Sequence, residues 1–332
     1  MQLAVLGAGA WGTALAVSFG HHHAVQLWSR NASLCHRLQQ ARGHASLLPG
    51  VTLPASVQVT ADLAAALAHA EVVVVAVAVA GVRDVLQQLA AHGRVPPVIL
   101  ACKGFEQGTG LLPHAVARAV LPAGTSVLAL SGPSFASEVA AGLPAALVLS
   151  CSEAAPLAHL LPALHHARLR LYSNSDPVGV EIAGALKNVI SIAAGMGDGM
   201  GMGLNARAAL ITRGLAEIRR LGEAFGARPD TFLGLAGVGD LMLTCTATLS
   251  RNYRVGAALA QGQSLASILT DLGEVAEGVA TAKSIARLQA ETGVELPICE
   301  AVAAVLSASI TPQAAIDRLL GREPRAETGQ TR

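Results

Sequence analysis

Aromatic side chains are scarce in this sequence: Phe, Tyr and Trp make up 3% of its 332 residues. Because 52% of the residues are nevertheless apolar, alanine, valine and leucine must build the core, as in helix-covered parallel sheets and closely packed helices. Charged residues are also few, at 14%, and so apolar a chain is not disordered over most of its length. The length is sufficient for two domains.

An excess of either charge is also absent, since the formal net charge is +1. We therefore expect no nucleic-acid partner. The longest hydrophobic run, 72–82, lies between Glu71 and Arg83 and is shorter than the ~20 residues that a transmembrane helix requires. We interpret it as a buried strand and expect no integral membrane segment.

Paired cysteines and a secretory leader are missing as well. The five cysteines form no CxxC pair, which is typical of reduced thiols, and the first residues have no basic region or cleavage site. We therefore expect a cytoplasmic protein. The histidines at 21–23 and 165–166 are consecutive, so their side chains cannot all face one ion, and no metal site is predicted.

The pattern of the first half predicts a parallel sheet. Continuously apolar runs alternate with Ala/Leu-rich helical stretches, as expected for strands covered on both faces. The predicted strands are residues 3–6, 25–28, 72–77, 98–101, 127–130 and 146–149, with a further strand allowed at 169–172.

The second half predicts helices alone. Asp176-Pro177 is a good helix start, because a capping carboxylate precedes a proline at the first helical position. Further helices are predicted at 204–225, 251–260, 264–272, 278–291, 298–307 and 312–320. The predicted fold is α/β, with a Rossmann-like, doubly wound, mainly parallel sheet in residues 1–175, an all-helical domain in 176–321 and a flexible tail in 322–332.

A dinucleotide-binding loop follows the first strand. Residues 7–12 read Gly-Ala-Gly-Ala-Trp-Gly, between a predicted strand and a predicted helix. In this motif Gly7 permits a tight turn, Gly9 allows close approach of a pyrophosphate, and Gly12 allows the helix to pack on the strand. The second strand ends without the carboxylate that usually binds the ribose of NAD. Arg30 lies there instead and suits the 2′-phosphate of NADPH, unless it is a solvated surface residue.

Lys187 and Asn188 interrupt an otherwise apolar helical segment, 180–193. Buried lysines are rare unless paired, and burial lowers their pKa by disfavouring the charged form. Such a lysine can exchange a proton with a substrate oxygen during carbonyl reduction. The alternative is that Lys187 extends along apolar neighbours to the surface.

Four more segments have the composition of a binding surface. Residues 237–241 place a carboxylate in a glycine turn, and 250–254 offer a hydroxyl, an amide and a guanidinium just before a helix. The second combination suits a phosphate, although each segment alone is as typical of ordinary loops and caps. Residues 103–104 and 132–135 follow strand ends, so they should face the ligand-binding edge of the sheet.

In order and spacing, these motifs resemble the bacterial-type NAD(P)-dependent glycerol-3-phosphate dehydrogenases, to about residue 320. The segments that carry the resemblance are GAGAWGTALA (7–16), CKG (102–104), SGPSFASEVAAGLP (131–144), LKNVISIAAGMGDG (186–199), NARAALITRGLAE (205–217), GVGDLMLTCT (237–246), SRNYRVG (250–256) and VAEG (275–278).

The resemblance implies reversible hydride transfer between NADPH, or NADH, and dihydroxyacetone phosphate, giving sn-glycerol 3-phosphate for glycerophospholipid synthesis. Lys187 matches the catalytic lysine, which is the general acid in reduction and the base in the reverse direction. Matches to substrate-binding positions are Lys103, Gly132, Ser134, Lys187, Asp240, Ser250, Arg251 and Asn252. Matches to cofactor-binding positions are Gly7, Gly9, Ala10, Trp11, Gly12, Arg30, Lys103, Ala136, Arg251, Val275 and Glu277. The negative charge of the Asp240 carboxylate would also orient Lys187 and keep it protonated.

The sequence departs from the family pattern at two places. Ala78-Val79-Ala80-Gly81 replaces a Pro-Ser or Pro-Thr turn near the cofactor, and Tyr253 replaces a residue that is commonly basic. Two other functions stay open: a related two-domain dehydrogenase for a hydroxy acid or hydroxyacyl thioester, and a non-catalytic NADPH sensor. A homodimer is compatible with the apolar helical half, but no motif establishes it.

Overall fold

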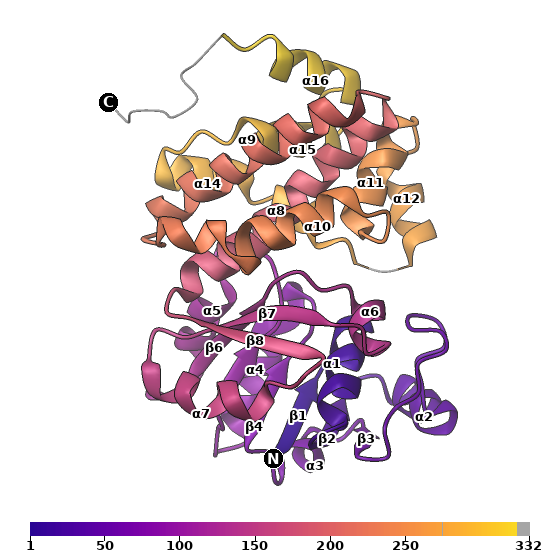
Figure 1. Ribbon diagram of the computed structural model, residues 1–332, viewed down its shortest axis with the longest axis vertical. Helices are drawn as coiled ribbons and strands as arrows, with labels where there is room; N and C mark the ends of the chain where they lie inside the picture. Colours follow the sequence, from indigo (N-terminus) through magenta and orange to yellow (C-terminus); the bar gives the residue numbers. More distant parts are fainter. Residues whose placement is uncertain (274, 324–332) are drawn as a thin grey trace.

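The computed structural model describes residues 1–273 and 275–323. The sheet and its covering helices form one part of the molecule, and the helices of the second half form the other (Figure 1). The last strand ends at Asn174 and the first helix of the second part begins at Pro177. Most of the predicted tail, from residue 324 on, lies outside the described residues.

The first part contains an eight-stranded sheet of order β3-β2-β1-β4-β5-β6-β7-β8. Only β7 runs antiparallel to its neighbour β6, and β8 runs parallel to β7, so the sheet is mainly parallel as predicted. The strands are β1 (Gln2–Leu6), β2 (Ala24–Trp28), β3 (Val57–Thr60), β4 (Val72–Val75), β5 (Val98–Leu100), β6 (Val127–Ser131), β7 (Ala145–Ser150) and β8 (Leu169–Asn174).

Helices cover both faces of this sheet, which explains why its central strands are continuously apolar. One core contains residues of α1, α2 and α7, and the core on the other face contains residues of α3, α4 and α5. The helices and turns of this part are α1 (Ala10–Gly20), α2 (Ala32–Ala41), α3 (Leu63–Leu67), η1 (Val79–Gly81), α4 (Val82–Ala91), α5 (Pro113–Val120), α6 (Ala136–Ala140) and α7 (Ala154–Leu164).

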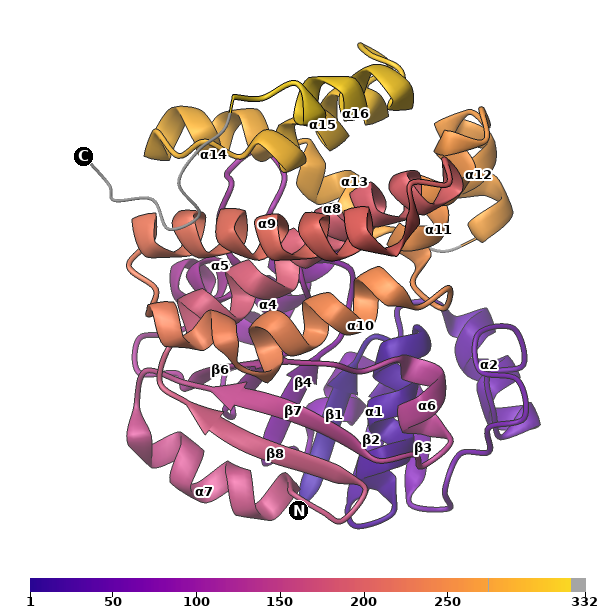
Figure 2. The ribbon, with the colours of Figure 1, turned by 45° about the horizontal axis from the view of Figure 1, so that its top comes forward.

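The edge strand β3 was not among the predicted strands. It pairs only with β2, at one side of the molecule next to α2 (Figure 2). Its sequence is Val-Gln-Val-Thr, in which Val57 and Val59 are buried and Gln58 is exposed. Two apolar residues are too weak a signal to distinguish an edge strand from a loop.

The second part is helical and is built around α8 (Pro177–Gly199). The carboxylate of Asp176 caps this helix by accepting from the Gly179 N–H, as the sequence predicted. The helix is long and apolar enough to cross a membrane, but 94% of its apolar window is buried inside the structure, as in a core helix. The other elements are α9 (Gly203–Ala224), η2 (Pro229–Leu233), η3 (Leu235–Gly239), α10 (Asp240–Thr246), α11 (Arg251–Ala260), α12 (Leu265–Leu272), α13 (Glu277–Ala282), α14 (Ile285–Thr292), α15 (Pro297–Leu306) and α16 (Pro312–Leu320).

The helix predicted over 278–291 is wrong, because the chain forms two helices, α13 and α14, with a break between them. The Gln107 side chain donates to the carbonyl oxygen of Ala280 (2.9 Å) and to Ser284 Oγ (3.4 Å). The N–H of Lys283 also bonds to Ala280, in a tighter turn. A loop distant in the sequence thus contacts the backbone at the break, which local periodicity does not reveal.

Candidate active site

The glycine loop after β1 has the geometry that a dinucleotide requires. Gly7 has φ +117°, which only glycine adopts without strain, and a Cβ on Gly12 would lie 1.8 Å from the Gly7 oxygen. A Cβ on Gly9 would meet no atom within 4 Å, so this position faces open space. Gly7 and Gly12 are therefore required by the close packing of strand and helix, while Gly9 leaves room for a ligand.

The N-terminus of α1 fits an anionic group at this loop. Its N-cap, Gly9, provides no side chain to bond the first N–H groups of the helix. Among the described residues, the buried Nε1 of Trp11 has no hydrogen-bond partner either. Free N–H groups at a helix N-terminus bind phosphate, so Gly9, Ala10 and Trp11 suit the pyrophosphate of a dinucleotide.

Arg30 lies beyond the end of β2 and is exposed. Its neighbours stabilise the turn, since Ser29 Oγ accepts from the Asn31 N–H (3.2 Å) and Asn31 caps α2 by accepting from the Leu34 N–H. The guanidinium is thus held on an ordered turn at the carboxyl edge of the sheet, where a nucleotide ribose lies in this fold.

A buried cluster of charges joins the two parts of the molecule. Lys187, on α8, donates to Asp240 Oδ1 and to Thr244 Oγ1, the latter at 2.9 Å. Lys103, after β5, donates to the other carboxylate oxygen of Asp240 (2.7 Å) and to the Gly132 carbonyl (3.3 Å). Asp240 is fully buried and Lys187 is 7% exposed. The expected contact of Lys187 with Asp240 is present, and the alternative of a surface lysine is excluded.

Burial gives Lys187 the electrostatics of an acid–base group. Desolvation lowers its pKa from 10.5 to about 7, while the Asp240 carboxylate opposes this shift and the Lys103 ammonium adds to it. A lysine with a pKa near neutrality can both donate and accept a proton at physiological pH. Lys103 is more accessible, with 17% of its side chain exposed.

The N-terminus of α11 forms the second polar region of the site. Ser250 caps this helix by accepting from the Tyr253 N–H (3.2 Å). The Asn252 amide donates to Asn188 Oδ1 (2.9 Å) and accepts from the Gly278 N–H (3.0 Å). Asn252 thus connects the lysine-bearing helix α8 to α13. The predicted residues of the 250–252 segment are held close to α8 by these buried bonds.

Glu277, at the start of α13, connects this region to the sheet. Its carboxylate accepts from the Val79 N–H (3.2 Å), in the turn that departs from the family pattern. Burial raises the pKa of Glu277, and the charge of Arg251 opposes that shift. Gly104 packs here as well, because a Cβ on it would lie 3.1 Å from Val79 Cγ2. The atypical turn is therefore packed against both parts of the molecule.

Of the other expected positions, Ser134 shares an acceptor with Lys103, the Gly132 carbonyl. Ser134 donates to the Gly132 carbonyl (3.0 Å), Ala136 begins α6, and Val275 is 53% exposed. Thr244 and Ser191, which sequence reasoning missed, both belong to the buried network. Thr244 had one usable signal: it follows Asp240 by four residues on a helix, so both face the same side.

The consecutive histidines form a contact of a different kind. The rings of His22 and His166 lie 4.6 Å apart between centroids, and His166 Nε2 lies 3.0 Å from Ser18 Oγ. Within residues 1–273 and 275–323, no group of three or more His, Cys, Asp or Glu side chains is arranged to hold a metal ion.

Comparison with known families places the chain. The model of the NAD-dependent glycerol-3-phosphate dehydrogenase N-terminus matches residues 2–156, and that of the C-terminus matches residues 176–317. The chain belongs to the NAD-dependent glycerol-3-phosphate dehydrogenase family. The resemblance that the motifs indicated is thus confirmed.

Individual members of the family are similar over their full length. A glycerol-3-phosphate dehydrogenase [NAD(P)+] from Aromatoleum aromaticum is 53% identical over 98% of this chain and 100% of its own length. The corresponding protein of Dechloromonas aromatica is 53% identical over 98% and 99%. The crystal structure of the Coxiella burnetii glycerol-3-phosphate dehydrogenase superposes with a TM-score of 0.92 at 36% identity, over 97% of this chain and 99% of that one.

Proposed function

We propose that this member of the family is an oxidoreductase that reduces dihydroxyacetone phosphate reversibly to sn-glycerol 3-phosphate with NAD(P)H. The observation that carries the proposal is the buried Lys187, held by Asp240 and Thr244 beside the capped N-terminus of α11. An acid–base group and a phosphate-type site are thus adjacent. Full-length similarity to glycerol-3-phosphate dehydrogenases supports the same reaction.

The residues divide the reaction between them. When bound, the nicotinamide supplies or accepts the hydride. Lys187 donates a proton to the substrate oxygen as negative charge develops on it, and removes that proton in the reverse direction. Asp240 favours the protonated form of Lys187, and Lys103, bonded to the other oxygen of Asp240, brings a second positive charge to the site. Such charges stabilise the transition state more than the neutral ketone.

Arg251 and the N-terminus of α11 are assigned to the phosphate. A guanidinium binds a phosphate with paired, charge-assisted hydrogen bonds, and a helix N-terminus adds its dipole. Gly132 and Ser134, at the end of β6, complete the substrate side. The buried Asn252 holds this helix at a fixed distance from Lys187.

Arg251→Ala is expected to raise KM for dihydroxyacetone phosphate by about ten- to a hundred-fold, since a charge-assisted hydrogen bond contributes roughly 1.5–3 kcal/mol. The measurement is loss of NADPH absorbance on addition of the substrate. Arg254→Ala, one turn further into the same helix region and exposed, is the matched control. An unchanged KM in Arg251→Ala would argue for a substrate without phosphate.

Arg30 is assigned to the 2′-phosphate of NADPH, because β2 ends without a ribose-binding carboxylate. Arg30→Ala is expected to raise KM for NADPH by about ten-fold and to leave KM for NADH within about two-fold, since only NADPH carries the extra charge. The same assay with each cofactor tests this. Equal changes for both cofactors would assign Arg30 to the adenine instead.

The reaction product is a precursor of glycerophospholipids, and we propose that this chain supplies it in the cytoplasm. All five cysteines are buried and free, which fits a reducing compartment.

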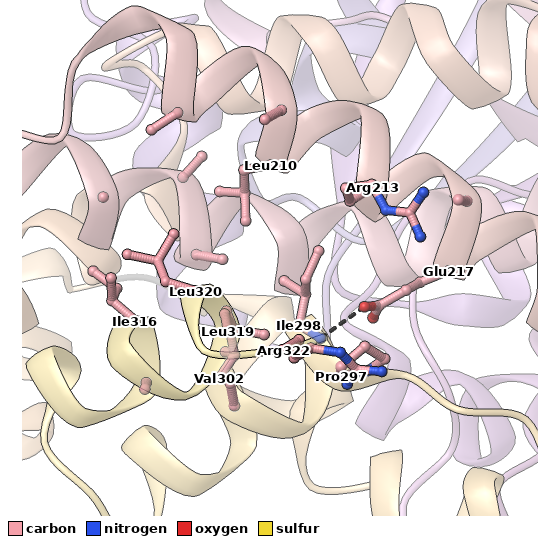
Figure 3. Close-up of a pocket in the computed structure, with 18 of the residues that line it drawn as sticks. Leu210, Arg213, Glu217, Pro297, Ile298, Val302, Ile316, Leu319, Leu320 and Arg322 are labelled. Carbon is pink, nitrogen blue, oxygen red and sulfur yellow. Dashed lines mark hydrogen bonds between the residues drawn. The ribbon is translucent and has the colours of Figure 1, made fainter. Parts of the chain in front are cut away.

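We also propose a homodimer, on a groove of about 1620 Å³ between α9 and the C-terminal helices α15 and α16 (Figure 3). Its floor is apolar, with Leu210, Ile298, Val302, Ile316, Leu319 and Leu320. Its charged residues have both signs: Arg207, Arg213, Arg219, Arg220 and Arg322 against Asp198, Glu223, Glu295 and Glu323. The Glu217 carboxylate is buried and accepts from the Ile298 and Cys299 N–H groups. A surface that carries both charges beside an apolar floor can pair with a second copy of itself.

Leu210→Glu is expected to convert the dimer to a monomer, because it places a charge in the centre of the groove. Light scattering coupled to gel filtration measures the mass. Leu143→Glu, at a 51% exposed leucine beside the sheet, is the control and should stay dimeric. A wild-type protein that is monomeric at micromolar concentration would contradict the proposal.

A further inference from the structure

Ser191 connects the proposed acid–base group to the proposed phosphate site. It lies on α8, one turn after Lys187, and is fully buried. Its hydroxyl donates to the Thr244 carbonyl (2.9 Å) and lies 3.1 Å from Ser250 Oγ. Thr244 binds Lys187, and Ser250 caps α11. One serine therefore contacts both halves of the site.

The number of protons in this network fixes the direction of its hydrogen bonds. A serine hydroxyl carries one proton, and a carbonyl oxygen can only accept. The Ser191 hydroxyl donates its one proton to the Thr244 carbonyl. Ser250 must therefore be the donor in the bond between the two hydroxyls. Ser250 Oγ also accepts from the Tyr253 N–H. In this arrangement the Ser250 hydroxyl has no proton left for a ligand.

We infer that Ser191 tunes the affinity for the phosphate by holding the proton of the Ser250 hydroxyl in the free enzyme. The inference rests on the proposed function, in which Ser250 contacts the substrate phosphate. When the phosphate binds, the hydroxyl of Ser250 turns from Ser191 to a phosphate oxygen. The bond to Ser191 is lost in this exchange, so binding is weaker than it would be without Ser191.

The same geometry confines the effect to substrate binding. Ser191 keeps its bond to the Thr244 carbonyl in both states, and the Thr244 hydroxyl, not its carbonyl, contacts Lys187. Turning the Ser250 proton therefore changes no contact of Lys187 or Asp240. Ser191 is a positioning residue that acts through Ser250, and it should change KM without changing the proton transfer.

The test is Ser191→Ala, which removes the acceptor of the Ser250 proton and places a strong helix former inside α8. It also removes the bond to the Thr244 carbonyl, but this bond is lost from the free and the substrate-bound enzyme alike. KM for dihydroxyacetone phosphate should fall about two- to ten-fold, the range of one net hydrogen bond, with kcat within about two-fold. Ser18→Ala is the matched control, because Ser18 is also a buried, hydrogen-bonded helix serine and contacts His166 instead. It should leave both constants unchanged.

The double variant separates this role from a general loosening of the helix packing. In the Ser250→Ala background, Ser191→Ala should no longer change KM, because the proton that it releases is absent. A purely structural role of Ser191 would change KM in both backgrounds. An unchanged or raised KM in Ser191→Ala, or the same change in both backgrounds, would overturn the inference and leave the proposed reaction intact.

A binding experiment tests the role of Ser191 even if the protein does not catalyse the proposed reaction. Absence of any turnover of dihydroxyacetone phosphate by the folded wild-type protein would contradict the proposed function. Calorimetric titration with inorganic phosphate then tests Ser191 independently of catalysis. Tighter binding to Ser191→Ala than to wild type would support the inference. Equal binding, or no binding to either protein, would overturn it.

Discussion

Replacing Lys187 with methionine is expected to lower kcat for ketone reduction by about a hundred- to ten-thousand-fold, the usual contribution of a general acid. Methionine has a similar length and suits the apolar surroundings of α8, but its thioether has no proton that it can donate to the substrate. The variant should fold, because the buried Asp240 carboxylate keeps Lys103 as its counter-charge (2.7 Å) when Lys187 is removed. KM should change less than kcat, since the phosphate site does not include this side chain.

The chain offers a matched control for this variant in Lys283, which is exposed at the end of α13. Lys283→Met should keep full activity. The measurement is NADPH oxidation under saturating substrate, with circular dichroism as a check on folding. A Lys187→Met enzyme that retains more than about a tenth of its kcat would assign proton donation to another group, and Lys103 would be the first to test.

Lys187 can be identified as a candidate functional residue from the sequence pattern alone. It interrupts a long apolar segment, and such an interruption indicates either a surface helix or a buried functional group. The surrounding residues leave no polar face, so the local pattern predicted a buried helix. Whether the Lys187 side chain itself is buried was settled only by the structure, in which it is 7% exposed. The same logic predicted the central strands, whose continuous apolar runs reflect a sheet covered on both faces.

The partners of Lys187 were harder to predict because they depend on how helices pack. Asp240 and Thr244 follow it by 53 and 57 residues, and Lys103 meets Asp240 across 137. The opposite charges of Lys187 and Asp240 suggested a bond between them. No local sequence pattern indicates that the Asp240 carboxylate accepts from two lysines. The break between α13 and α14 was missed for a similar reason, since Gln107 contacts it from the sheet side.

Asp240→Asn is expected to have the second large effect, on both stability and pH dependence. Asp240 is fully buried and accepts from Lys187 and Lys103 through separate oxygens. A neutral amide would leave the buried Lys187 and the partly exposed Lys103 near one another without a counter-charge. Breaking a buried ion pair in this way costs about 3–5 kcal/mol of unfolding free energy. Chemical denaturation near pH 6 measures this loss.

The loss should shrink as the pH rises. The pKa of Lys187 is already lowered in the folded state, to about 7 from 10.5. The free energy of unfolding therefore increases as the pH rises and this group loses its proton. The destabilisation caused by burying the charged Lys187 is greatest below its folded pKa. It decreases as the pH rises from that pKa to 10.5. Without Asp240 the folded pKa falls further, because the carboxylate is what raises it. The deficit of Asp240→Asn against wild type should therefore be smaller at pH 9 than at pH 6.

The rate of reduction should respond to the same shift, because the acid must be protonated. In the wild type, kcat/KM for reduction is expected to fall as the pH rises through about 7, because kcat/KM reports the free enzyme, and in Asp240→Asn this fall should move to lower pH. Asp176→Asn is the control: Asp176 is also buried and caps α8, but contacts neither lysine. It should lose stability and keep the wild-type pH profile. An unshifted profile in Asp240→Asn would mean that the proton donor in reduction is not the lysine that Asp240 holds.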